Sequence, residues 1–223
     1  EVDPKETFDL IQETFNFPRS GEPVRFPPVE VHNIPGEVRY HEERLPVNQG
    51  KLTLGYRTNT SYRDEDYVPL MFYNGILGGF PHSKLFQNVR EKASLAYYSF
   101  SRLEKHKGIQ LIGSGIEVKN YQQALEIILE QVELIRKGKI TREEMENTRR
   151  ALISMYKVVG DSPYNLVNFY MDGLIGEREE GIDYFIRKIE DVREDNVVEI
   201  AHRVHLDTVY FLRSQGEERG EES

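Results

Sequence analysis

Apolar residues recur at helical spacing along much of the second half of the chain. The clearest pattern runs over about 121–137 and is followed by Gly138, a residue type that commonly ends helices. Its apolar positions are Leu125, Ile128, Leu129, Val132 and Ile135. One face of this segment is therefore apolar, and we expect a helix that packs that face against a core.

Capping residues predict further helices. Thr141 with Glu144 three residues later is a capping-box pattern for a helix that runs to about Val159. Asp3 and Pro4 suit the start of a short amphipathic helix, whose apolar stripe is Phe8, Ile11 and Phe15. Other helices are expected from Asp64 or Asp66 to a stop at Gly78 and Gly79, after Ser83, after Pro163, and near 181–191 and 195–204.

Alternating apolar and polar residues predict strands. Segments 37–43 and 51–58 are expected to pair, and in the second Leu52, Leu54 and Tyr56 alternate with polar or small residues. Segments near 95–103 and 109–116 meet at the turn K-H-K-G, and T-V-Y-F-L near the end is expected as a closing strand. Two strand pairs separated by helices indicate the α+β class, with an antiparallel-rich sheet covered by helices on one face.

Composition adds limits on the partners. The chain has 223 residues, a net charge of -9, no cysteine and no apolar run long enough to cross a membrane, and it starts at Glu1, as expected of a fragment or processed chain. The acidic balance argues against nucleic-acid binding, and the absence of cysteine fits a cytoplasmic protein without disulfides or thiolate zinc sites. We expect a helix and extended linker over 1–36, a single α+β domain over 37–213 and a flexible acidic tail over 214–223.

The residues alone do not predict a self-sufficient active site. His202 and His205 are spaced i, i+3 and would share one face of a helix, but no third ligand and no H-E-x-x-H motif accompanies them. No G-x-S-x-G elbow exists, and G-I-L-G-G lacks the Lys-Ser/Thr of a phosphate-binding loop. The runs of carboxylates are typical of solvated helix faces.

Arg90 and Tyr97 lie seven residues apart, across a predicted change from helix to strand. Judged from the residues alone, packing explains both, because an arginine suits a helix C-terminus and a tyrosine packs well in a half-buried strand. The same arrangement would also place a guanidinium and a phenol at one ligand.

The run G-I-L-G-G-F-P-H-S-K-L-F-Q-N-V-R-E-K-A-S-L-A-Y-Y-S-F-S, residues 75–101, resembles the second, non-catalytic half of pitrilysin-type zinc peptidases. This family includes insulin-degrading enzyme and the mitochondrial processing peptidases. V-D-P-K-E-T-F-D-L-I resembles a helix near the end of the family's first half, and T-R-E-E-M-E-N-T-R-R resembles a helix of the second. The sequence G-G-F-P-H-S-K-L-F is similar to that of a bacterial branch of the family, whose members are often found as paired proteins, one with the zinc motif and one without.

The resemblance implies a processing-peptidase-like α+β half that binds peptide and completes a closed chamber with a zinc-bearing half or a homologous partner subunit, as a dimer. It implies that Arg90 and Tyr97 assist at the substrate: the guanidinium holds a carbonyl or carboxylate, and the phenol donates to a developing oxyanion. Zinc is expected in the partner half. No H-x-x-E-H motif occurs here, so this chain alone is expected to be inactive.

One departure from the family pattern bears on the metal. Where a first half carries zinc ligands, an alignment on the glycines of G-I-L-G-G places Leu70, Tyr73 and Asn74, which do not form a zinc triad. The alternative function is a catalytically inactive scaffold subunit, which stabilises a peptidase partner without contacting the scissile bond.

Overall fold

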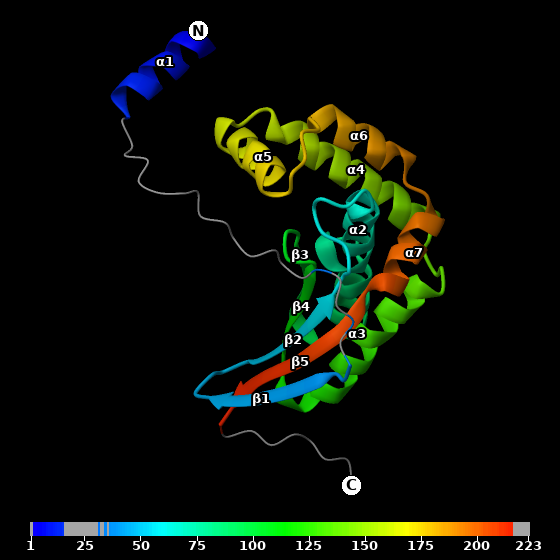
Figure 1. Cartoon of the computed structure of the whole chain (residues 1–223). Helices are drawn as coiled ribbons and strands as arrows, with labels where there is room; N and C mark the ends of the chain where they lie inside the picture. The colour runs from blue at the N-terminus through cyan, green and yellow to red at the C-terminus, as the bar shows by residue number, and fades with distance from the viewer. Residues whose placement is uncertain (1, 16–30, 32–33, 35, 216–223) are drawn as a thin grey trace.

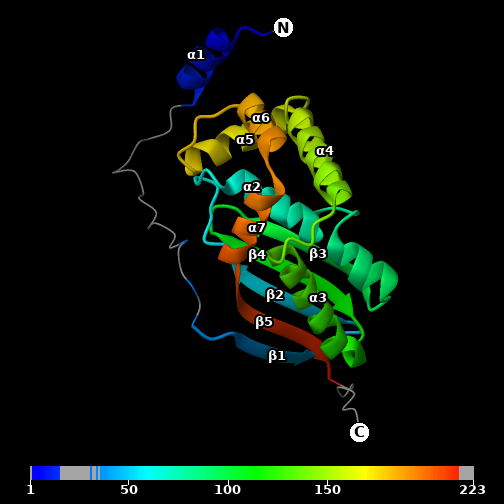
Figure 2. The ribbon, with the colours of Figure 1, turned by 90° about the vertical axis from the view of Figure 1, so that its right-hand side faces the viewer.

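The computed structural model describes residues 2–15, 31, 34 and 36–215. One five-stranded sheet forms the centre, and helices gather against one of its faces (Figures 1 and 2). The strands are β1 (Arg39–Leu45), β2 (Gly50–Arg57), β3 (Ala96–Glu104), β4 (Ile109–Ile116) and β5 (His205–Ser214). The helices are α1 (Pro4–Thr14), α2 (Tyr67–Asn74), α3 (Tyr121–Arg136), α4 (Arg142–Val159), α5 (Pro163–Ile175), α6 (Ile182–Asp191) and α7 (Glu194–Arg203). This architecture confirms the α+β class.

The order of the strands is β1-β5-β2-β4-β3. The expected pairing of 37–43 with 51–58 is wrong, because β5 lies between β1 and β2, parallel to the first and antiparallel to the second. Burial explains the placement. All seven residues of β1 are exposed, which suits an edge strand, whereas β5 buries Val209 and Phe211 and suits the interior of the sheet.

The helix caps follow the sequence closely. The side chain of Asp3 accepts hydrogen bonds from the backbone N–H groups of Lys5 and Glu6 at the start of α1. Thr141 and Glu144 form both bonds of the capping box of α4. The helix expected after Ser83 does begin there, and the carbonyl of Ser83 accepts the N–H of Gln87 at 3.0 Å. Its buried hydroxyl, however, has no hydrogen-bond partner in the described part of the chain, so the expected side-chain cap does not form.

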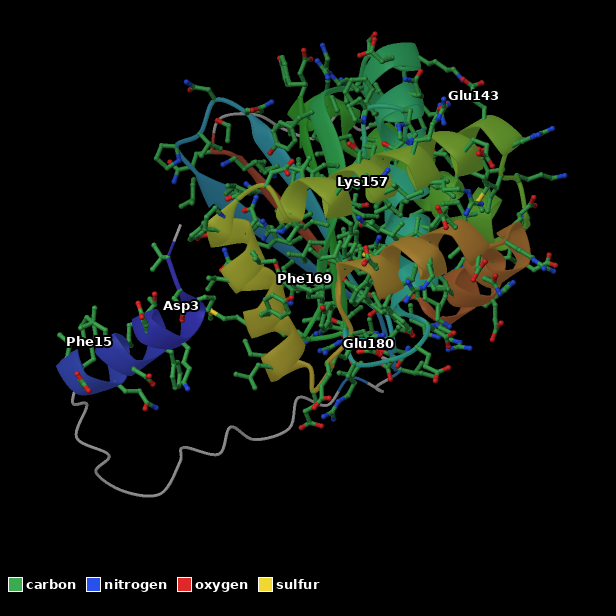
Figure 3. All side chains as sticks on the ribbon, turned by 90° about the horizontal axis from the view of Figure 1, so that it is seen from above. Asp3, Phe15, Glu143, Lys157, Phe169 and Glu180 are labelled. Carbon is green, nitrogen blue, oxygen red and sulfur yellow. The ribbon has the colours of Figure 1, made fainter. Side chains whose placement is uncertain are left out.

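The core lies between the sheet and the helices. Alternate residues of β2, including Leu52 and Leu54, are fully buried. They belong to the same core cluster as Ile128 of α3 and Phe72 of α2. Helices α4, α5 and α6 form an outer group (Figure 1). Phe169 points from α5 toward this group, and its ring centroid lies 5.8 Å from that of Phe185 on α6 (Figure 3).

Helix α2 continues into a π-helical turn, η1 (Gly75–Gly79), and a second π-helical turn, η2 (Phe86–Lys92), precedes β3. The glycines of η1 permit close approach. A Cβ at Gly78 would lie 2.6 Å from the backbone N of Ser101 on β3, and one at Gly75 would lie 2.7 Å from the Thr148 side chain on α4. The run G-I-L-G-G therefore packs the end of this helix against a strand and another helix.

None of the helices in the described segments is long and apolar enough to cross a membrane.

Candidate functional site

The two residues singled out in the sequence lie on either side of the connection between η2 and β3. After η2 ends at Lys92, Ser94 takes a left-handed backbone conformation, and the N–H of Leu95 donates to the carbonyl of Val89 at 3.1 Å. Val89 and Leu95 are buried and anchor the turn. Isolated π-helical turns are frequent at functional sites, because they re-aim side chains within a helix.

Arg90 lies in η2 and points outward. Its side chain is 42% exposed, its guanidinium lies 4.5 Å from the centroid of the Phe86 ring, and its Nε is 3.8 Å from Oε1 of Glu91. An exposed ion pair at this distance contributes little free energy. The guanidinium is thus held loosely and retains donors for a ligand.

Tyr97 stands at a β-bulge. Ala96 pairs with Ile116 and Tyr98 pairs with Gly115, so the intervening Tyr97 has no partner on β4. A bulge bends the strand and redirects a side chain, and bulges are common beside active sites. The Tyr97 side chain is 64% exposed.

Tyr97 lines a cleft of about 340 Å³ at the end of the sheet. The cleft is lined by Asn48, Gln49, Gly50, Tyr97, Ile116, Glu117, Val118 and Lys119. Arg90 does not line this cleft, and no hydrogen bond joins Arg90 to Tyr97 within the described residues. The structure places the two residues on the same connection, both exposed, without bringing them into contact.

The residues at the aligned metal position do not fit zinc. Leu70 is buried, and burial raises the pKa of the fully buried Tyr73 well above its usual range, so its hydroxyl stays protonated. Asn74 ties the helix to the sheet: its Oδ1 accepts from Ser101 Oγ at 2.7 Å and from Gln110 Nε2 at 3.2 Å. This position is structural.

The histidine pair is also separated by the fold. His202 lies in the last turn of α7, whereas His205 is the first residue of β5, so the expected common helical face does not exist. Among the described residues no group of three or more His, Cys, Asp or Glu side chains could hold a metal ion.

Sequence reasoning missed the surroundings of Tyr97. Gln49 comes from the β1–β2 connection and Glu117 from the end of β4, and their nearness depends on the register of the sheet. It also missed the rings of Tyr98 and Phe100, which lie across glycines of β4. The alternation of Gly113 and Gly115 opposite two aromatic residues was the available signal.

The described residues thus form an α+β domain with a five-stranded sheet, in which the residues of α2 at the aligned metal position do not fit zinc. The family model described as "Peptidase M16 inactive domain" matches residues 1–152 of the chain. The chain therefore belongs to this family, the pitrilysin-type zinc peptidases that the sequence resembles.

Individual relatives agree with this assignment. The "Probable inactive metalloprotease YmfF" of Bacillus subtilis is 42% identical over 167 residues, covering 75% of this chain and 39% of the relative. The "Uncharacterized zinc protease YmxG" of the same species is 32% identical over 51% of this chain and 29% of the relative. A conserved protein from Enterococcus faecalis V583 has a TM-score of 0.84 at 34% identity and matches 97% of this chain but 51% of its own.

The chain thus spans less than half the length of the curated relatives that it matches. A protease from Helicobacter pylori, at a TM-score of 0.79 and 19% identity, shares the fold.

Proposed function

We propose that this chain is the substrate-binding, non-catalytic half of a zinc-dependent endopeptidase, completing a peptide chamber with a zinc-bearing half or partner subunit. The observation that carries the proposal is the exposure of Arg90 and Tyr97 at one helix-to-strand connection in a chain of the M16 inactive-domain family. Arg90 is 42% exposed and makes only a long, exposed ion pair with Glu91 and a contact with the Phe86 ring, and Tyr97 is 64% exposed, so both side chains can reach a ligand.

The chemistry of the two side chains supports this role. Arg90 offers planar, permanently charged donors for a peptide carbonyl or carboxylate. Tyr97 offers a phenolic O–H to an oxygen that gains negative charge during peptide-bond cleavage. Zinc would be held by the partner half, and we place the assembly in the cytoplasm, since the chain has no cysteine.

The test is a peptide-cleavage assay on this chain assembled with its zinc-bearing partner. Arg90→Ala is expected to lower kcat/KM by about 10²–10³, an effect as large as that of removing a single oxyanion donor, and Tyr97→Phe, which removes the proposed oxyanion donor, is expected to lower it by at least tenfold. Arg187→Ala on α6 and Tyr164→Phe on α5 are matched controls, because both residues are exposed and lie on other elements.

A loss below about threefold for Arg90→Ala would remove its assisting role. Activity that requires the chain but ignores both substitutions would instead identify a scaffold subunit. The description of the 42% identical relative as an inactive metalloprotease makes that alternative a concrete one.

A further inference from the structure

Two aromatic rings lie on the sheet face opposite the core helices. Tyr98 and Phe100 of β3 stack with their ring centroids 5.9 Å apart and their planes inclined by 27°. The neighbouring positions Ser99 and Ser101 point to the core side, where both are buried. The hydroxyl of Ser101 donates to Asn74 of α2, which identifies this side as the one covered by helices in Figure 1. We call Tyr98 and Phe100 the aromatic platform.

Glycines in β4 let these rings lie flat on the sheet. Phe100 pairs with Gly113 and Tyr98 with Gly115. A Cβ at Gly113 would lie 2.7 Å from Cζ of Phe100, and one at Gly115 would lie 2.4 Å from Cε1 of Tyr98. Side chains on a strand normally stand perpendicular to the sheet, so rings that occupy the Cβ positions of the next strand have turned down onto it.

One face of each ring therefore remains open. Tyr98 is 37% exposed and Phe100 is 40% exposed, although both contact the backbone beneath them. A flat, exposed π surface of two rings favours stacking with another apolar or aromatic group, which gains from both area burial and ring geometry.

The aromatic platform is continuous with the cleft at Tyr97. Nε2 of Gln49 lies 2.7 Å from the position of a Cβ at Gly115, beside the Tyr98 ring, and Gln49 also lines the cleft. On the same face, the exposed Lys51 pairs with Gly115. This positive charge beside the rings disfavours a cationic side chain there.

We propose that the aromatic platform binds an aromatic or large aliphatic side chain of an extended peptide, and so makes this half selective for such peptides. The inference rests on the proposed function and names its substrate class. Alternate side chains of an extended peptide lie about 6.6–6.8 Å apart on one face. That spacing is close to the 5.9 Å between the centroids of the two rings, so two alternate side chains of a peptide running along β3 can each meet one ring. Gln49, which lies beside Tyr98 and lines the cleft, marks the direction in which the peptide would continue toward Tyr97.

The test measures binding without cleavage. Because the chain contains no tryptophan, the emission of a tryptophan-containing peptide reports its own binding. We would titrate the chain with a ten-residue peptide carrying a central Trp, and compete it with otherwise identical peptides that carry Leu, Ala or Lys. The Trp peptide is expected to bind about fivefold or more tighter than the Ala peptide, and the Lys peptide weakest.

Two platform variants and one control follow. Phe100→Ala is expected to bring the ratio of the affinities for the Trp and Ala peptides close to one. Phe100→Leu keeps an apolar side chain and is expected to give an intermediate ratio. Tyr164→Ala removes an aromatic residue that is 76% exposed on α5 and is expected to leave the ratio unchanged. Circular dichroism checks that each variant is folded.

Equal affinities for the Trp and Ala peptides, or no binding of any peptide, would overturn the inference. An affinity ratio of the Trp and Ala peptides that is unchanged in Phe100→Leu and Phe100→Ala would also overturn it. The same holds if the only effect of these variants is to dissociate a dimer in sedimentation, which would make this face an interface between copies of the chain. If the chain prefers the Trp peptide but Arg90→Ala does not change cleavage, the proposed role of Arg90 is wrong and the role of the aromatic platform stands. If Arg90→Ala lowers cleavage but the chain shows no preference among the peptides, only the role of the platform is wrong.

Discussion

Lys84 is a charged residue in a nearly closed environment. Its side chain is 9% exposed, and its Nζ lies 2.8 Å from Oε1 of Glu144, a carboxylate whose Oε2 accepts the backbone N–H of Thr141 at 2.7 Å. One carboxylate thus caps α4 and also holds the segment that leads into η2. A pair with this little solvent costs more to break than a surface pair, because its remaining charge is left partly desolvated.

We expect Lys84→Ala to lower the free energy of unfolding by about 2 kcal/mol, below the usual range for fully buried pairs because Glu144 keeps some solvent contact. Urea denaturation measures the change. Arg63→Ala is the control, since Arg63 and Glu177 are 55% and 76% exposed, and it is expected to change stability by less than about 0.5 kcal/mol. Equal effects of the two substitutions would show that Lys84 is not held by its partner.

The contacts of Glu144 were predictable from the sequence only in part. The pairing of Thr141 with Glu144 was read from their spacing, because a capping box lies within one turn of chain. The third member, Lys84, lies sixty positions away and has no local signal. Likewise, the exposure of Tyr97 was not predictable, since it depends on one extra residue in the register of β3 with β4.

At the scale of elements, the contact of η1 with β3 depends on a missing side chain. Gly78→Ala would place a Cβ 2.6 Å from the backbone N of Ser101 and 3.0 Å from the carbonyl carbon of Phe100. Because backbone cannot turn aside as a side chain can, we expect a loss of about 2–3 kcal/mol in thermal or urea unfolding.

Gly160→Ala is the matched control for Gly78→Ala. Gly160 has a φ of -67°, and its nearest neighbour to an added Cβ is 3.7 Å away, so we expect no loss, or a gain of about 0.5 kcal/mol from a less flexible unfolded chain. A Gly78→Ala protein as stable as Gly160→Ala would show that η1 can move away from β3.

Asp207 links three strands and predicts a pH dependence. Thr208 Oγ1 donates to its carboxylate at 2.6 Å, Arg57 on β2 at 3.1 Å, and Arg39 on β1 also donates. The hydrogen bond from Thr208, followed by those from the arginines, lowers the pKa of Asp207 from 3.8 to about 2.

A carboxylate whose pKa is lower in the folded state contributes stability above its unfolded pKa and loses it as the pH falls through the folded pKa. We therefore expect Asp207→Asn to cost about 1–2 kcal/mol at pH 6 and to cost progressively less between pH 4 and pH 2. Urea unfolding at pH 6, 4 and 2.5 measures this, with the exposed Asp161→Asn as control. A cost that does not change with pH would exclude the linkage.

The expected hairpin of 37–43 with 51–58 shows where element-level reasoning failed. Each segment was identified as a strand from alternation or composition, but pairing was inferred from nearness in sequence. The structure selects partners by burial instead, and the apolar β5 displaces the charged β1 from the side of β2. The hairpin of β3 and β4 was predictable because its turn, ending at Gly108 with φ +59°, is local.

At the scale of the whole molecule, we expect α1 to contribute little to the free energy of unfolding. None of its described residues is buried, and Phe8, Leu10, Ile11 and Phe15 are 49–62% exposed. Deletion of residues 1–15 is therefore expected to change the melting temperature of the remaining chain by less than about 2 °C. Differential scanning calorimetry of both chains measures this, and a larger fall would show that α1 packs against the sheet domain.

The family resemblance carried the whole-molecule prediction further than the local patterns did. The family itself followed from the motifs over 75–101, whereas the α+β class and the helical cover on one face followed from the alternation of strand and helix patterns. Contacts between distant segments did not, since their partners have no local signal in the sequence; Arg39 of β1, for example, pairs with Thr208 of β5. The aromatic platform belongs to this second group, because it needs both the bulge of β3 and the glycines of β4.

The central position of β5 has a consequence for biosynthesis. β1 and β2 leave the ribosome before the other three strands of the sheet. Among the described strands β1 pairs with β5 alone, and β5 is encoded some 160 positions later than β1. Until that late strand is made, β1 lacks its partner and one side of β2 is an open template for other chains. Charged residues on an exposed strand disfavour its pairing with other chains, so we expect Glu42 and Glu43 of β1 to limit aggregation of the nascent chain during this interval.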